Sequence, residues 1–177
     1  MTLSLALKRF GLTSILAECS DLSSALAVHS HLQRNPPKGL IELIPAAQTV
    51  LVRFEQARYA SEFARTFRGE GISGGAQTQR SERIIDVIYD GEDLDEVAQH
   101  TGLTVEQVIN AHTQQTWSVA FAGFAPGFFY LHAEDNVLEV PRRSSPRTAV
   151  PSGAVGLAGQ FSGIYPRTSP GGWQLIG

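Results

Sequence analysis

The 177-residue sequence predicts two units of different fold class, an α+β unit followed by a mainly-β unit. Three observations lead to this prediction. Apolar runs near the N-terminus alternate between strand and helix character. Residues 69–79 (GEGISGGAQTQ) have the composition of a flexible linker. From residue 141 to 177 the chain holds five Pro and seven Gly, which favours short strands joined by shaped loops.

The first unit is predicted over residues 1–80. A strand at 13–19 is followed by a helix at 22–33, which begins after the capping pair Ser20-Asp21 and ends before Pro36-Pro37. Two apolar strands and a second helix with aromatic residues at helical spacing come next, at 40–44, 49–54 and 57–67. This order predicts a ferredoxin-like α+β domain if one further strand completes the sheet.

The second unit is predicted over residues 81–177. It opens with a strand at 83–89 and continues with two short helices at 94–100 and 105–113, the second preceded by a capping-box pattern of Thr104 and Gln107. A strand at 117–124 then begins the β-rich part. The helix pair is spaced like a DNA-binding helix-turn-helix, but it carries four acids and no Lys or Arg, which argues against DNA binding.

Charge is unevenly distributed, although the whole chain carries a formal charge of only −3. Residues 83–140 hold ten acids and one Arg, whereas residues 141–177 hold four Arg and no acid. The basic end is therefore suited to an anionic ligand or an acidic partner surface. A single cysteine, Cys19, excludes an internal disulfide, and no secretory signal or membrane-spanning run is evident, so we expect a cytoplasmic protein.

Several residues are candidates for chemistry. Arg142 and Arg147 lie among prolines in the acid-free stretch 141–177, and guanidinium groups bind carboxylate or phosphate in bidentate fashion. His112 closes a predicted helix, where it is either a helix-end histidine or an acid–base group. The segment 121–130 (FAGFAPGFFY) is either a core strand turning a corner or a turn whose amides approach a ligand. The other histidines show no metal-ligand spacing, so no metal is predicted, and no phosphate-binding motif is present.

Three motifs stand out in the second unit: GFAPGFFYL, PRRSSPRTAVPSGAVGLAG and GIYPRTSPGGWQLIG. They resemble the signature of the allophanate hydrolase subunit 1 family, which includes the B subunit of 5-oxoprolinase and the kinase inhibitor KipI. The resemblance covers about residues 83–177 and implies a cyclophilin-like β-barrel for the second unit. It also implies a subunit 2 family (PxpC-like) partner and a LamB/YcsF-like (PxpA-like) subunit, which together carry out ATP-dependent opening of 5-oxoproline to glutamate.

The same resemblance implies the site residues. His112, Arg142, Arg147 and Tyr165 are the expected catalytic residues. Arg142 or Arg147 would hold a carboxylate or a phosphorylated intermediate, and Tyr165 and Gln160 would bond to a carbonyl. The expected substrate-binding residues are Phe124, Pro126, Gly127, Gln160, Ser169 and Gly171. ATP would be used by the complex and bound outside this chain.

The sequence departs from the family pattern in two places. The glycine-rich segment before the acidic helix is shortened to Asp90-Gly91-Glu92-Asp93, and the chain stops at Gly177, where family members continue. We therefore expect a barrel truncated at its C-terminal end. Two alternative functions stay open: a KipI-like, non-catalytic inhibitor of a sensor histidine kinase, and a carboxyltransferase component of a biotin-dependent urea carboxylase.

Overall fold

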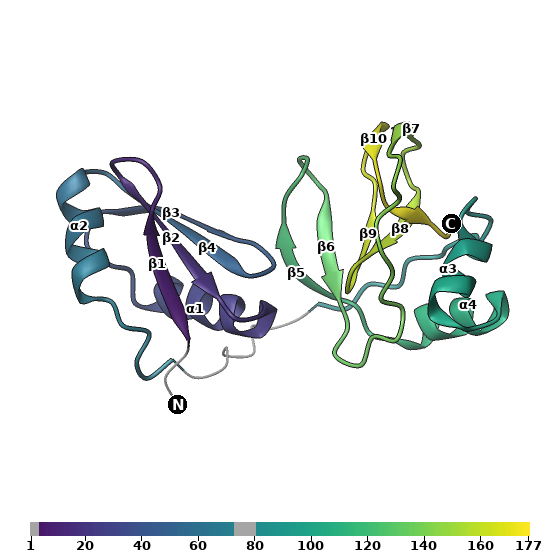
Figure 1. Ribbon diagram of the computed structural model, residues 1–177, viewed down its shortest axis with the longest axis horizontal. Helices are drawn as coiled ribbons and strands as arrows, with labels where there is room; N and C mark the ends of the chain where they lie inside the picture. The colour runs from purple at the N-terminus through teal and green to yellow at the C-terminus, as the bar shows by residue number, and fades with distance from the viewer. Residues whose placement is uncertain (1–3, 73–80) are drawn as a thin grey trace. The chain divides into compact units, whose positions relative to one another are not determined.

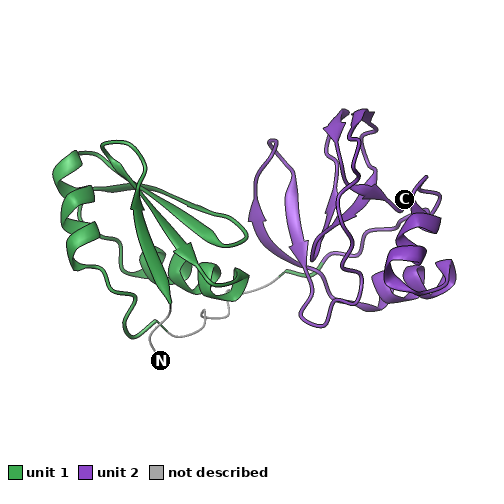
Figure 2. Ribbon diagram, in the orientation of Figure 1, with its two compact units in different colours: residues 1–82 green, residues 83–177 purple. Residues whose placement is uncertain are grey.

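The computed structural model describes residues 4–72 and 81–177. The chain divides into two compact units, Met1–Glu82 and Arg83–Gly177 (Figure 2). Most of the predicted linker at 69–79 lies outside the described residues. In the described part of the chain, no helix is both long enough and apolar enough to cross a membrane.

The first unit is an antiparallel four-stranded sheet with two helices (Figure 1). The strand order in the sheet is β1-β2-β4-β3. The elements, in chain order, are β1 (Leu5–Arg9), β2 (Ser14–Cys19), α1 (Leu22–Arg34), β3 (Leu40–Pro45), β4 (Thr49–Phe54) and α2 (Ala57–Thr66). The strand that completes the sheet, β1, precedes β2 and does not follow α2. The coarser α+β class is therefore observed, and the ferredoxin-like description stays a prediction.

Strand alternation and a helix cap explain why this unit folds as it does. Ile15 on β2 and Val50 and Val52 on β4 are fully buried, and they pack with α1 and α2 in one core. The side chain of Asp21 accepts a hydrogen bond of 2.7 Å from the Ser24 amide, as an N-cap residue does. This cap fixes the start of α1 at the residue that the sequence predicts.

The second unit combines two helices with two sheets. A five-stranded antiparallel sheet has the order β11-β8-β9-β6-β5, and a separate ribbon pairs β10 with β7. The elements are α3 (Leu94–Thr101), α4 (Val105–Gln114), β5 (Ser118–Ala122), β6 (Phe129–His132), β7 (Arg147–Val150), β8 (Val155–Ala158), β9 (Phe161–Ile164), β10 (Ser169–Gly171) and β11 (Gln174–Leu175). The described strands form two sheets and not one closed barrel, so the cyclophilin-like barrel stays a prediction.

The predicted strand at 83–89 is wrong. Residues 81–91 form no helix or strand, and Ile84, Ile85 and Ile88 are exposed. Their β-branched side chains favour a strand only where a neighbouring strand supplies ladder bonds and cover. No described strand pairs with this segment.

Strand β9 separates the second unit into two faces. Side chains alternate along a strand, so Phe161 and the position of Gly163 face one side and Ser162 faces the other. A side chain at Gly163 would meet the rings of Phe128 and Trp173, which places an aromatic cluster on the first face. Ser162 bonds to α4 on the second face. We call the side with Phe128, Phe161 and Trp173 the aromatic face, and the side on which Ser162 bonds to α4 the helix-covered face.

Candidate functional site

The loop 123–128 begins with a strained γ-turn. The Ala125 amide donates to the Gly123 carbonyl at 2.7 Å, and Phe124 at the centre has φ +64°. Positive φ is costly for a side chain as bulky as phenylalanine. The strain holds the Phe124 ring outward, where it is 60% exposed. Strained positions of this kind cluster at binding and catalytic sites.

A second turn completes the loop. The Phe128 amide donates to the Ala125 carbonyl at 3.0 Å, with Pro126 and Gly127 between them. Gly127 has φ +84°, and proline followed by a glycine of positive φ is the pattern of a type II turn. A side chain at Gly127 would lie 3.4 Å from Pro166. Pro126 and Gly127 thus shape the loop and bring it close to the residue that follows Tyr165.

The aromatic face joins this loop to Tyr165. The Phe124 ring makes edge contacts with Phe128 and Tyr165, at centroid distances of 5.4 and 6.3 Å. The Tyr165 hydroxyl would lie 2.3 Å from a Cβ at residue 171, so only glycine fits there. Burial raises the pKa of Tyr165, and the phenol therefore stays protonated at neutral pH. Phe124, Tyr165 and Gly171, all expected site residues, come together here.

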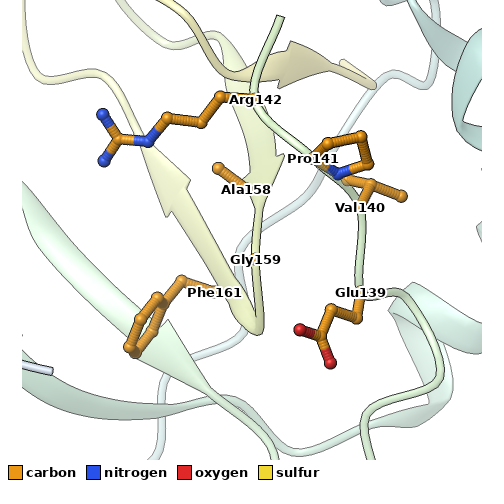
Figure 3. A pocket seen from close by; sticks show the side chains of 7 residues that line it. All are labelled: Glu139, Val140, Pro141, Arg142, Ala158, Gly159 and Phe161. Atoms are coloured by element: carbon orange, nitrogen blue, oxygen red, sulfur yellow. The ribbon is translucent and has the colours of Figure 1, made fainter. Parts of the chain in front are cut away.

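An open hollow of about 600 Å³ lies between residues 139–142 and the turn that joins β8 to β9 (Figure 3). Ala158, Gly159 and Phe161 form its other side. Arg142 and Glu139 both line it, and neither side chain makes a hydrogen bond or ion pair with another residue in the described ranges. Phe161 lines the hollow and also makes edge contacts with Phe121 and Tyr130, so the hollow adjoins the aromatic face.

Two sets of hydrogen bonds, a backbone bridge and the contacts of the Asn136 side chain, hold the walls of the hollow together. Val140 and Gly159 form an antiparallel bridge in which the Gly159 amide donates at 2.7 Å and the Val140 amide at 3.3 Å. Asn136 donates from its side chain to the Gln160 carbonyl at 3.2 Å, and its own oxygen accepts from the Leu138 amide. The hollow is therefore preorganised, because its two walls are tied at both the bridge and the turn.

Arg147 pairs through its backbone with Gly171 and acts electrostatically on Tyr165, but its side chain is engaged in a cluster of ion pairs. Its Nη2 donates to Asp93 at 2.8 Å and to Glu92 at 3.0 Å, and Arg143 donates to the same Asp93 oxygen. The other Asp93 oxygen accepts from the Leu175 amide at 2.7 Å. Burial opposes ionisation of Asp93, but these donors outweigh it and lower the pKa of the carboxyl. Arg147 is thereby engaged in joining β7 to the start of α3.

His112 lies on the helix-covered face, away from the aromatic face. Its Nδ1 is 2.7 Å from the Tyr89 hydroxyl and its Nε2 is 2.9 Å from the Ser162 hydroxyl. Burial lowers the pKa of His112 to about 4, so the imidazole is neutral at pH 7. A neutral imidazole has one donor and one acceptor nitrogen, and both are taken. The Trp117 indole also donates to the His112 carbonyl at 2.9 Å.

The expected site residues thus fall into three groups. Phe124, Pro126, Gly127, Tyr165, Gly171 and Arg142 belong to the aromatic face and the adjoining hollow. Arg147 is held in a partly buried ion-pair cluster, and His112 is held in a separate buried network. Gln160 sits at the turn beside the hollow, and the Ser169 hydroxyl is buried with no hydrogen-bond partner in the described part of the chain. Among the described residues, no cluster of three or more His, Cys, Asp or Glu could hold a metal ion.

Three residues that contribute to these sites were not selected from the sequence: Glu139, Asp93 and Ser162. Glu139 lies just before the acid-free stretch, and its position two residues before Pro141 could have drawn attention to it. Asp93 and Ser162 gave no such signal. Each bonds to a residue about 50 positions away in the chain, and only the tertiary structure reveals such a pair.

Comparison with known proteins extends these observations. Residues 5–177 match the family described as "Carboxyltransferase domain, subdomain C and D". The chain belongs to this family. The match covers both units, whereas the three sequence motifs lie within residues 83–177.

Two relatives are named as the B subunit of 5-oxoprolinase. The protein from Bacillus subtilis is 35% identical over 167 residues, which cover 85% of this chain and 70% of the relative. The protein from Escherichia coli is 38% identical over 143 residues, which cover 78% of this chain and 66% of the relative. The chain thus spans about two thirds of the length of these relatives.

Two solved structures share the fold of this chain. The crystal structure of TTHA0988 is similar with a TM-score of 0.68 and 33% identity, over 93% of this chain and 34% of that one. The urea amidolyase of Kluyveromyces lactis has the same TM-score at 17% identity, over 99% of this chain and 13% of that one. At that identity the likeness to urea amidolyase shows the fold alone.

Proposed function

We propose that this chain is the B-type component of an ATP-dependent 5-oxoprolinase, which opens the lactam of 5-oxoproline to glutamate. The observation that supports this most strongly is the similarity to two relatives of that name along most of the chain. Arg142 adds a structural reason, because it is an exposed arginine without a partner among the described residues, at the edge of a preformed hollow.

The geometry distinguishes between the two arginines that were expected to hold an anion. The charge of the Arg147 guanidinium is already balanced by two carboxylates, both bonded to Nη2, although its buried Nη1 has no hydrogen-bond partner in the described part of the chain. Its pKa is raised, chiefly by the hydrogen bond to Asp93. We therefore assign the carboxylate or phosphorylated intermediate to Arg142. Arg147 becomes a positioning residue that fixes β7.

The remaining residues have roles that follow from their places. Phe124 and Tyr165 contact each other on the aromatic face, and we assign the protonated hydroxyl of the buried Tyr165 as the donor to a carbonyl oxygen. His112 has both ring nitrogens engaged and an abnormally low pKa, so we assign it to orienting β9 through Ser162 and not to proton transfer in the reaction.

ATP and the other subunits complete the proposal. This chain has no phosphate-binding motif, and we assign ATP binding to a partner. The partners are a subunit 2 family protein and a LamB/YcsF-like subunit, and we expect activity only in their complex. ATP would activate the lactam carbonyl by phosphorylation, and this chain would hold the end of the substrate at which negative charge develops.

Reconstitution tests this function. The chain is mixed with purified subunit 2 and LamB/YcsF-like proteins, and ATP-dependent release of glutamate from 5-oxoproline is measured with and without it. The proposal predicts glutamate release only when all components are present. Undiminished release without this chain, or no release with all three, would contradict it. Inhibition of histidine-kinase autophosphorylation by the chain alone would instead favour the KipI-like alternative.

A further inference from the structure

The hollow at residues 139–142 holds a pair of opposite charges that the chain itself leaves unmatched. Arg142 and Glu139 both line it, both are exposed, and neither forms an ion pair with the other or with another described residue (Figure 3). Ion pairs elsewhere in this unit, such as those of Asp93, are made within the chain. An unmatched pair beside a preformed hollow is the arrangement that a zwitterionic ligand requires.

A break in the strand pattern places both side chains at the hollow. Leu138 and Val140 are buried on one side of the segment, so alternation would send Glu139 to the opposite side and Arg142 to the buried side. Pro141 interrupts this pattern, because it has no amide to continue the ladder beyond the Val140–Gly159 bridge. The next backbone bond is made by the Arg143 amide to a different partner, Gly172, at 2.8 Å. Arg142 is turned outward as a result.

The spacing of the charges limits the ligand. Residues three apart in a nearly extended chain have Cα atoms about 10 Å from each other. The two side chains must lean inward to share one small molecule, and they fit best when its charges are several bonds apart. Between them, Ala158 and Gly159 leave the floor open, since a side chain at Gly159 would meet no atom within 4 Å.

We propose that this hollow binds the two charges that lactam opening creates. Hydrolysis of the lactam C–N bond adds one water molecule, turning the ring carbonyl into a carboxylate and the ring N–H into an ammonium group. In the glutamate formed, these two charged groups lie further apart along the carbon chain than the ammonium and the α-carboxylate. Arg142 binds the new carboxylate and Glu139 binds the new ammonium, whereas the closed lactam offers neither charge.

The choice of glutamate as the ligand rests on the proposed 5-oxoprolinase function, but the charge pattern of the hollow does not. Binding to this chain alone therefore tests the inference separately from activity of the complex. L-Glutamate and glutarate are suitable probes, because glutarate has both carboxylates and lacks the ammonium group. Amide NMR signals of Val140 and Gly159 report on the hollow directly.

The test measures the affinity of two ligands, L-glutamate and glutarate, for two forms of the protein, the wild type and Glu139→Gln. The wild-type chain is expected to bind L-glutamate about tenfold more tightly than glutarate. Glu139→Gln should abolish this preference by weakening glutamate binding while changing glutarate binding less than about twofold, and Glu134→Gln is the matched exposed control. Equal affinity of the wild type for both ligands, or an equal loss of both in Glu139→Gln, would overturn the proposal. So would binding that leaves the Val140 and Gly159 signals unmoved.

Discussion

At the scale of single residues, Phe124 occupies a backbone conformation that suits glycine, and His112 stays neutral in a buried network down to a pH well below its ordinary pKa. The Phe124 conformation costs stability at any pH, whereas the neutral state of His112 costs stability only at a pH where the unfolded chain would bind the proton. Of the two residues, only Phe124 lies on the aromatic face, which adjoins the hollow. We therefore expect only the strain at Phe124 to serve ligand binding directly.

The strain at Phe124 predicts an unusual order of stability. Phe124→Ala keeps the unfavourable backbone angle and removes the ring, whereas Phe124→Gly removes both. We therefore expect the glycine variant to be more stable than the alanine variant by about 1 kcal/mol in urea denaturation. Both should lose activity in the reconstituted complex. An alanine variant as stable as the glycine variant would show that the turn is not strained.

The buried His112 predicts a pH dependence of stability. The pKa of histidine is about 6.5 in the unfolded chain and about 4 for His112 in the fold, so between these values only the unfolded chain gains this proton. The free energy of unfolding therefore falls as pH decreases through this window, by at most about 1.4 kcal/mol per pH unit.

Urea denaturation at pH 7 and pH 5 measures this effect. The wild type should lose about 2 kcal/mol more than His112→Gln over this interval. The comparison with the variant removes the contributions of other titrating groups, such as His29, whose pKa burial also lowers. Identical losses in the two proteins would mean that His112 is protonated in the fold at pH 5.

At the scale of elements, the helices and caps were predictable and several long-range contacts were not. Thr104 and Gln107 form the expected capping box, because both partners lie within one turn. The segment 83–89 was predicted as a strand from its composition, but a strand also needs a pairing partner, which local sequence does not reveal. The Asp93 ion pairs and the His112–Ser162 bond join elements far apart in sequence, so local patterns could not show them.

Gly91 approaches β11 so closely that adding one methyl group, in Gly91→Ala, is expected to lower the stability of the second unit sharply. A Cβ at Gly91 would lie 2.4 Å from backbone atoms of residues 175 and 176. Backbone cannot rotate away as a side chain can, so Gly91→Ala should destabilise the second unit by more than about 3 kcal/mol. Both tryptophans of the chain lie in this unit, which makes their fluorescence during urea unfolding the appropriate measurement.

Gly102→Ala is the matched control for this prediction. Gly102 ends α3 with φ +71°, and a side chain there would meet open space. Its replacement should cost only about 1 kcal/mol, from backbone strain alone. Equal effects of the two substitutions would mean that Gly91 can move away from β11.

At the scale of the whole molecule, the family could be identified from three motifs, yet the site could not be assembled from them. Those motifs contain Arg142, Arg147 and Tyr165, but nothing in the sequence indicates that Arg147 is bonded to Asp93 and Glu92. Glu139, which lies outside the motifs, shares the hollow with Arg142. A family signature thus gave the candidate residues, and tertiary contacts divided them between binding and positioning roles.

The most direct test of the account compares Arg142→Ala with Arg147→Ala in the reconstituted complex. We predict that Arg142→Ala lowers kcat/KM for 5-oxoproline by on the order of 100-fold and leaves the melting temperature of the chain unchanged. Arg147→Ala should instead lower the melting temperature, because it removes a partner of the buried Asp93. Arg167→Ala, another exposed arginine, should change neither quantity. Full activity of Arg142→Ala, or an Arg147→Ala protein that keeps its stability but loses activity, would contradict the account.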